Sequence, residues 1–134
     1  MINRRARLLL KHADQEWIFE RNSPILTLGR DSNCQMVVRD PMASRLHANI
    51  EVRQGKFFLI DKSTNGTFVW FDDQSKVVLH REELMLRGKG RLTFGHNLDE
   101  TTEDFACFEV RDSEADQPSV TPPSQSRQPS YVEK

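Results

Sequence analysis

Short apolar segments with a two-residue alternation run through the chain from about residue 4 to residue 110, separated by polar or glycine-containing turns. This period is typical of β-strands and not of amphipathic helices, whose apolar residues recur every three or four positions. The sequence therefore predicts an all-β fold, an antiparallel β-sandwich of about eleven strands, because the turns leave no room for crossover helices. The expected strands are Arg4–Leu10, Glu16–Glu20, Ile25–Leu28, Gln35–Val38, Leu46–Arg53, Lys56–Asp61, Thr67–Phe71, Lys76–Leu79, Arg91–Phe94 and Phe105–Val110, with a weaker eleventh at Leu84–Leu86.

Two dipeptides predict how these strands connect. Gln54-Gly55 lies between two apolar segments and predicts a tight hairpin turn, and Asn65-Gly66 marks a second turn. Within Leu46–Arg53 the even-numbered positions are apolar, so we expect them to face the core. The odd-numbered positions, from His47 to Arg53, are polar and are expected to face water.

The composition changes sharply after Arg111. The last 23 residues hold four of the six prolines and five serines but no phenylalanine, so they lack the apolar surface that would offset the entropy of ordering. We therefore expect one folded domain at residues 1–111 and a disordered Pro/Ser-rich tail at residues 112–134.

Charge and cysteine content exclude several classes of protein. With 19 Lys and Arg against 20 Asp and Glu, no overall field favours nucleic acid or an anionic membrane as a partner. The longest apolar run near the start, Leu8–Leu10, is too short for a signal peptide or a membrane span, so we expect a cytoplasmic location. Cys34 and Cys107 lack the spacing of metal ligands, and we expect neither a disulfide framework nor a metal.

Four short motifs follow one another in the first half of the chain. Gly29-Arg30 ends a strand, Asp40-Pro41 precedes Ser44-Arg45-Leu46-His47, and Thr64-Asn65-Gly66-Thr67 lies in a loop. Written as LTLGRD, DPMASRLHA and DKSTNGTFV, these segments resemble the forkhead-associated (FHA) family of phosphothreonine-binding domains. The later stretch VVLHREELMLRGKG is similar to bacterial signalling FHA domains found beside nucleotide cyclases. The resemblance implies an FHA/SMAD-like sandwich.

The motif residues have chemistry that suits a phosphothreonine. Arg30 can present two parallel N–H groups to the phosphate, the hydroxyl of Ser44 can complete the phosphate shell, and Arg45 can add a second cation. By the resemblance, Asn65 holds the backbone of the ligand and Thr64 lies at the same surface.

Three further residues are expected to shape the site and not to touch the ligand. Gly29 precedes the first arginine, and Gly66 permits the turn after the asparagine. The resemblance gives His47 a supporting role, hydrogen-bonding within the loops, and not that of a general base.

An enzyme is the less favoured class. Ser44 and His47 suggest a hydrolase, but no Gly-x-Ser-x-Gly elbow surrounds the serine, and side chains three positions apart on a strand point to opposite faces. The remaining histidines, His12, His80 and His96, lack ligand-like spacing and are interpreted as surface or turn residues. The run Arg87–Arg91, RGKGR, lacks the pattern of a nucleotide loop and is interpreted as a basic turn. We expect no catalytic residue, no metal and no cofactor.

The resulting prediction is a monomeric adaptor or regulatory module that binds a protein phosphorylated on threonine by a Ser/Thr kinase. The alternative is a phosphate-independent interaction domain with the same fold. Thr101, Thr102 and Thr121 lie in solvated segments, so one of them, once phosphorylated, is a further candidate ligand for the same site, either within one chain or between two copies.

Overall fold

The computed structural model describes residues 6–99, 102 and 104–111, and within this part of the chain it contains eleven strands and no helix. Their bounds are β1 (Arg7–His12), β2 (Gln15–Phe19), β3 (Leu26–Gly29), β4 (Met36–Val37), β5 (Ala48–Arg53), β6 (Lys56–Asp61), β7 (Thr67–Phe71), β8 (Lys76–Leu79), β9 (Glu83–Met85), β10 (Lys89–Phe94) and β11 (Ala106–Arg111). The predicted disordered tail, together with Arg4, Thr101 and Thr121, lies outside the described residues.

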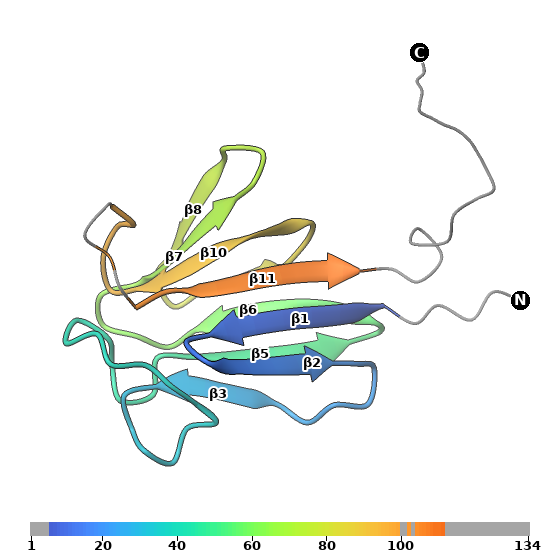
Figure 1. Cartoon of the computed structure of the whole chain (residues 1–134), viewed down its shortest axis with the longest axis horizontal. Coiled ribbons are helices and arrows are strands. Elements are labelled where there is room, and N and C mark those ends of the chain that lie inside the picture. The colour runs from blue at the N-terminus through green and yellow to red at the C-terminus, as the bar shows by residue number, and fades with distance from the viewer. Residues whose placement is uncertain (1–5, 100–101, 103, 112–134) are drawn as a thin grey trace, which may run out of the picture.

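The strands form two sheets that pack face to face (Figure 1). One sheet has six strands in the order β2-β1-β11-β10-β7-β8, and the other has five in the order β4-β3-β5-β6-β9. Neighbouring strands are antiparallel except for the short β3–β4 pair, which is parallel. The predicted all-β sandwich is confirmed.

The hydrophobic core lies between the sheets and is built by alternating side chains. In β1, for example, Leu8 and Leu10 are fully buried, while Lys11 is exposed. Each fully buried aliphatic or aromatic side chain contributes roughly 1.5–3 kcal/mol of transfer free energy. The largest such side chains are Phe57, Phe94, Leu8, Leu10, Leu26, Leu28, Met36, Ile50, Leu59 and Leu92.

The Gln54-Gly55 turn joins β5 to β6 as predicted. Both residues have positive φ, 53° and 77°, and the flanking Arg53 and Lys56 are paired across the two strands. Two successive positive φ values give the turn a twist that matches that of the strands, so the hairpin closes with two residues.

The expected alternation in Leu46–Arg53 is wrong at its first two positions. The strand begins at Ala48, so Leu46 lies before it and is 44% exposed, whereas His47 is fully buried. The His47 ring is buried because main-chain groups of two loops satisfy both of its nitrogens. A hydrogen-bonded histidine therefore lies in the interior, at a position that the alternation predicted to face solvent.

Two other interpretations are corrected by the structure. His12 is buried at the end of β1, where its Nε2 lies 2.5 Å from Asp104 Oδ1, and it is neither a surface nor a turn residue. Within the predicted basic turn, Lys89–Arg91 belongs to β10, and only Arg87 and Gly88 lie in the connection. Among the described residues there is no helix of the length and apolarity that a bilayer span requires.

Candidate phosphopeptide-binding site

Three loops meet at one end of the sandwich, on the left in Figure 1. They connect β3 to β4 (residues 30–35), β4 to β5 (residues 38–47) and β6 to β7 (residues 62–66). The first two are joined by main-chain bonds, because Arg30 N donates to Ser44 O and Asp31 N donates to Arg45 O, each at 3.0 Å. All five predicted ligand-contacting residues lie on these loops.

Gly29 lies where the first two loops approach most closely. A Cβ atom at this position would lie 2.0 Å from the carbonyl oxygen of Arg45, well inside any van der Waals contact. Only glycine allows this approach without a shift of backbone. Gly29 therefore allows Arg30 to lie next to Ser44, and its site-shaping role stays a prediction.

Arg30 is exposed at the end of β3, but its side chain is fixed at one point. Its Nε donates to the carbonyl oxygen of Ala43 over 2.6 Å. A guanidinium has five N–H donors, so this bond orients the group and leaves the terminal nitrogens for a ligand. None of the described carboxylates pairs with Arg30, and its charge is available to an anion.

Ser44 and Arg45 follow on the next loop. Ser44 Oγ accepts a bond from Thr64 N at 3.1 Å, which ties the β4–β5 loop to the β6–β7 loop and leaves the hydroxyl proton for donation. The Arg45 side chain is 81% exposed and lies 3.8 Å from Asp31 Oδ2. An ion pair this exposed is weak, so Arg45 can exchange Asp31 for a ligand at little cost.

Asn65 and Gly66 form the tip of the third loop. Asn65 is exposed, and its Nδ2 donates to the main-chain oxygen of Met42 at 3.0 Å. This bond uses one of the two amide protons, so the other proton and the side-chain oxygen can contact a peptide backbone. Gly66 has a φ of +97°, which lies in the region that favours glycine.

His47 connects two of the loops from below. Its Nδ1 accepts from Ser44 N at 2.9 Å, and its Nε2 donates to Gly66 O at 2.9 Å. Burial lowers the pKa of His47, although the Gly66 carbonyl and two carboxylates oppose the shift. The ring is therefore neutral, with its proton on Nε2 as these partners require. Because Nδ1 already accepts a hydrogen bond from a main-chain N–H, His47 has no free nitrogen lone pair that could take a proton from the Ser44 hydroxyl.

A comparison of sequences decides the family. The family model described as the FHA domain matches residues 26–95, a little over half of the chain. The chain belongs to the FHA-domain family. FHA domains are binding and regulatory modules, so the expectation of a non-enzymatic chain is confirmed.

Known proteins resemble this FHA domain in sequence or in fold. The chain is 32% identical over 77 residues to the oxoglutarate dehydrogenase inhibitor of Corynebacterium efficiens, a match that covers 57% of this chain and 54% of that protein. The chain thus spans about half the length of this relative. The Rv1747 FHA-1 structure of Mycobacterium tuberculosis has a TM-score of 0.59 at 22% identity, over 79% of this chain and 97% of that one. The MEK1 FHA domain, solved with a phosphothreonine peptide of HOP1, has a TM-score of 0.57 at 18% identity, over 78% and 97%.

A buried carboxylate supports the third loop of this FHA domain. Asp61 Oδ1 accepts from Ser63 Oγ at 2.7 Å and from Thr67 Oγ1 at 2.6 Å, and its Oδ2 accepts from Arg81 N at 2.8 Å. Ser63 Oγ in turn accepts from Gly66 N at 2.7 Å. The sequence placed Asp61 at the end of a strand and at the start of the DKSTNGTFV motif but gave it no role, because its partners belong to three different segments.

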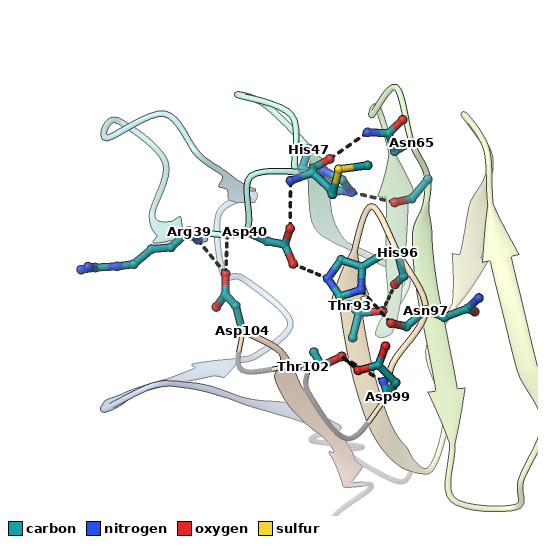
Figure 2. Close-up of polar contacts among 12 residues, drawn as sticks. Arg39, Asp40, His47, Asn65, Thr93, His96, Asn97, Asp99, Thr102 and Asp104 are labelled. Carbon is teal, nitrogen blue, oxygen red and sulfur yellow. Dashed lines mark hydrogen bonds and ion pairs between the residues drawn. The ribbon is translucent and has the colours of Figure 1, made fainter.

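A second network supports the β4–β5 loop (Figure 2). The Asp104 carboxylate accepts from Arg39 N at 2.6 Å and from Asp40 N at 2.9 Å, and it also contacts His12. Burial opposes its ionisation, but the bonds from His12 and the two main-chain groups hold the pKa of Asp104 below its usual value. Asp40 Oδ1 accepts from Met42 N at 2.8 Å, and Oδ2 contacts His96. The Asp40-Pro41 motif marked part of this network in the sequence, but nothing marked Asp104.

The candidate site carries exposed positive charge and no cluster of metal-ligating side chains among the described residues. Among residues 6–99, 102 and 104–111, no group of three or more His, Cys, Asp or Glu side chains could hold a metal ion. Of the two exposed arginines, Arg45 lies on the same loop as the Ser44 hydroxyl and Arg30 on the adjoining loop, and hydrogen bonds between these loops fix their geometry. Such a preformed set of charged and neutral donors suits a phosphate dianion.

Proposed function

We propose that this FHA domain binds phosphothreonine within an extended peptide, through Arg30, Ser44, Arg45, Thr64 and Asn65. The observation that carries the proposal is the state of Arg30. Its Nε is anchored on the Ala43 carbonyl, its main-chain N–H is bonded to Ser44, and none of the described carboxylates neutralises it. A fixed, unneutralised guanidinium beside an exposed hydroxyl fits a phosphate better than any neutral ligand.

The five residues contact different parts of the ligand. Arg30 and Ser44 bind the phosphate, and Arg45 leaves Asp31 to add a second positive charge. The Thr64 N–H holds the oxygen of Ser44 in place, and Asn65 bonds the peptide backbone through its free amide groups. Each bond to the charged phosphate contributes about 1.5–3 kcal/mol.

The output that we propose is regulation of a protein phosphorylated by a Ser/Thr kinase. The related inhibitor of Corynebacterium efficiens carries the name of a regulatory protein, which supports this role for the shared FHA part. Residues 1–111 are the folded module in this proposed role and act as a monomer in the cytoplasm, and residues 112–134 form its tail.

Self-recognition is a second use that we propose for the same site. Of the three threonines concerned, only Thr102 is described, and its Oγ1 accepts from Asp99 N at 2.9 Å. Phosphorylation would break this local bond and free the segment to act as a ligand for the same site of another copy.

Calorimetry with matched peptides tests the proposed function. A threonine peptide library is titrated in phosphorylated and unphosphorylated form into the wild type, Arg30→Ala and Arg53→Ala. We expect binding of the phosphorylated form only, a loss of at least about tenfold in Arg30→Ala, and wild-type affinity in Arg53→Ala. Arg53 is the matched control because it lies at the end of β5 away from the site and is paired with Glu51 and Glu83.

The alternative function, phosphate-independent interaction, predicts a different result in the same experiment. Peptides would then bind equally well with and without the phosphate, and removing Arg30 would not distinguish the two forms. That outcome would overturn the phosphothreonine proposal while leaving the FHA fold untouched.

A further inference from the structure

The carbonyl groups that hold the two main ligand-binding side chains belong to consecutive residues. Arg30 Nε is bonded to Ala43 O, and Asn65 Nδ2 is bonded to Met42 O. The direction of these two carbonyls therefore fixes both side chains. Whatever sets the backbone at Met42 and Ala43 also sets the geometry of the candidate site.

Asp40 sets that backbone. Its Oδ1 accepts from Met42 N at 2.8 Å, and its main-chain oxygen accepts from Ala43 N at 3.0 Å. Both bonds turn the segment back on itself, as an aspartate at the start of a turn commonly does. Asp40 is itself buried, so its carboxylate needs a strong partner on the remaining oxygen.

His96 is that partner. Its Nε2 contacts Asp40 Oδ2, while its Nδ1 lies 2.7 Å from the main-chain oxygen of Asn97 (Figure 2). Both oxygens are acceptors, so both ring nitrogens must donate, and only the imidazolium can do so. Thr93 Oγ1, on β10, donates to His96 O at 2.6 Å and holds His96 next to the end of that strand.

We propose that His96 is a positioning residue for phosphothreonine binding and that it acts through Asp40. As an imidazolium it holds the Asp40 carboxylate, which accepts from Met42 N and so orients the turn at Met42 and Ala43. The carbonyls of these two residues in turn hold Asn65 and Arg30. Neutral His96 has one donor for two acceptors, so either Asp40 or the Asn97 carbonyl loses its bond. The inference rests on the proposed function for its ligand, but not for its geometry.

The charged and polar groups around His96 favour its protonated form. Burial disfavours the charged form, but the bonds to the Asn97 carbonyl and Asp40 outweigh it and raise the pKa of His96 above its ordinary value of 6.5. Asp99, on the same segment, adds to the upward shift. The other ionisable groups near the network are His12 and Asp104, which contact each other, the neutral His47, and Lys76, which bonds the Asn97 side chain.

The direction of the pH effect follows from the raised pKa. The imidazolium contacts of His96 with Asp40 and the Asn97 carbonyl are fully formed below the ordinary histidine pKa. They are lost as the pH rises through the pKa of His96 in the folded protein. The phosphate of the ligand is already a dianion above about pH 7, so its own titration does not contribute on the alkaline side. Binding is therefore expected to weaken as the pH rises through the folded-state pKa of His96.

The first arm of the test needs no ligand. The full chain is followed by NMR from about pH 6.5 to about pH 8.5. In the wild type, the Asn65 side-chain amide and the Arg30 Nε–H signals should move with the midpoint of the His96 ring. In His96→Gln, which keeps one donor but does not titrate, both signals should stay still. Signals that move equally in this variant, or that ignore His96 in the wild type, would overturn the proposal.

The second arm measures affinity for the best-bound phosphothreonine peptide of the library. We expect the wild type to lose roughly three- to tenfold between about pH 7 and about pH 8.5, and His96→Gln to change little over that range. His80→Gln is the matched control, since His80 is an exposed histidine after β8 and should behave as the wild type does.

A flat profile in His80→Gln would assign the titration to His80 and overturn the proposal, as would an unchanged slope in His96→Gln. If no peptide binds in a phosphate-dependent way, the proposed function fails, and the first arm still decides whether His96 positions the two side chains.

Discussion

The two ends of this sandwich each carry an arginine, and the two arginines are held in opposite ways. Arg53, beside the β5–β6 hairpin, is bonded to Glu51 and Glu83 and lies over the Phe58 ring at 5.1 Å. Arg30, at the loop end, is bonded through its side chain to a main-chain carbonyl. The first charge is already neutralised on the surface, whereas the second is oriented without being neutralised. An arginine that is fixed but not paired is the one that suits a ligand.

The scaffolds below the two arginines also differ. The hairpin end closes with a two-residue turn, so its geometry is local. The loop end depends on carboxylates that bond groups far away in the chain, namely the buried Asp61 with Arg81 and the partly buried Asp104 with Arg39. The candidate site is therefore expected to be the more vulnerable end, in the order of the predictions that follow.

The largest effect is expected at Asp61. In Asp61→Ala the hydroxyls of Ser63 and Thr67 and the Arg81 N–H lose their common acceptor inside the protein. We expect a loss of about 3–5 kcal/mol in the free energy of unfolding, measured by urea denaturation. The counterpart at the hairpin end is Glu51→Ala, which removes an acceptor from the exposed Arg53 and should change the free energy of unfolding far less, because water screens this pair. Similar losses in the two variants would contradict the contrast between the ends.

The next effect is expected at two glycines. In Gly29→Ala the new Cβ would lie 2.0 Å from the Arg45 carbonyl oxygen, so the first two loops must separate. We expect a loss of about 2–3 kcal/mol and weakened phosphopeptide binding. Gly55→Ala places its Cβ in open space and strains only the positive φ of +77°, so it should cost about 1 kcal/mol and leave binding unchanged. Thermal unfolding and calorimetry on both variants check this, and a Gly29→Ala variant with wild-type affinity would contradict it.

The same contrast explains what the sequence could predict. Strands and the Gln54-Gly55 hairpin follow from neighbouring residues, because alternation and turn preferences are local, and both predictions are confirmed. The motifs also placed Arg30, Ser44 and Asn65 on loops that the structure brings together. Their contacts with a ligand stay predictions.

The supporting network could not be found in this way. The acceptors for Arg30 and Asn65 are main-chain carbonyls, which every residue has, so residue identity carries no signal for them. Asp104 bonds main-chain groups 64 and 65 positions away, and His96 contacts Asp40 at a separation of 56. No local pattern joins such residues, and for this reason His12 was assigned to the surface although it is buried against Asp104.

The smallest effect concerns acid stability and compares Asp104 with Glu83. Both carboxyls have pKa values below their ordinary ones, Asp104 through His12 and two main-chain groups despite burial, and Glu83 mainly through its bond to Arg53. A depressed pKa means that stability is present above the unfolded value and is lost as the pH falls through the folded one. The stability advantage of the wild type over Asp104→Asn should therefore shrink below about pH 4.

The advantage over Glu83→Gln should shrink in the same direction but by less, because Glu83 is exposed and water screens its pair with Arg53. Urea unfolding between about pH 3 and about pH 7, at low salt and at about 0.5 M salt, measures both differences. Added salt should reduce the Glu83 difference and leave most of the Asp104 difference, since the latter depends on partly buried bonds to fixed main-chain groups. A salt-sensitive Asp104 difference would mean that this carboxylate acts as a surface charge and does not hold the loop that supports the site.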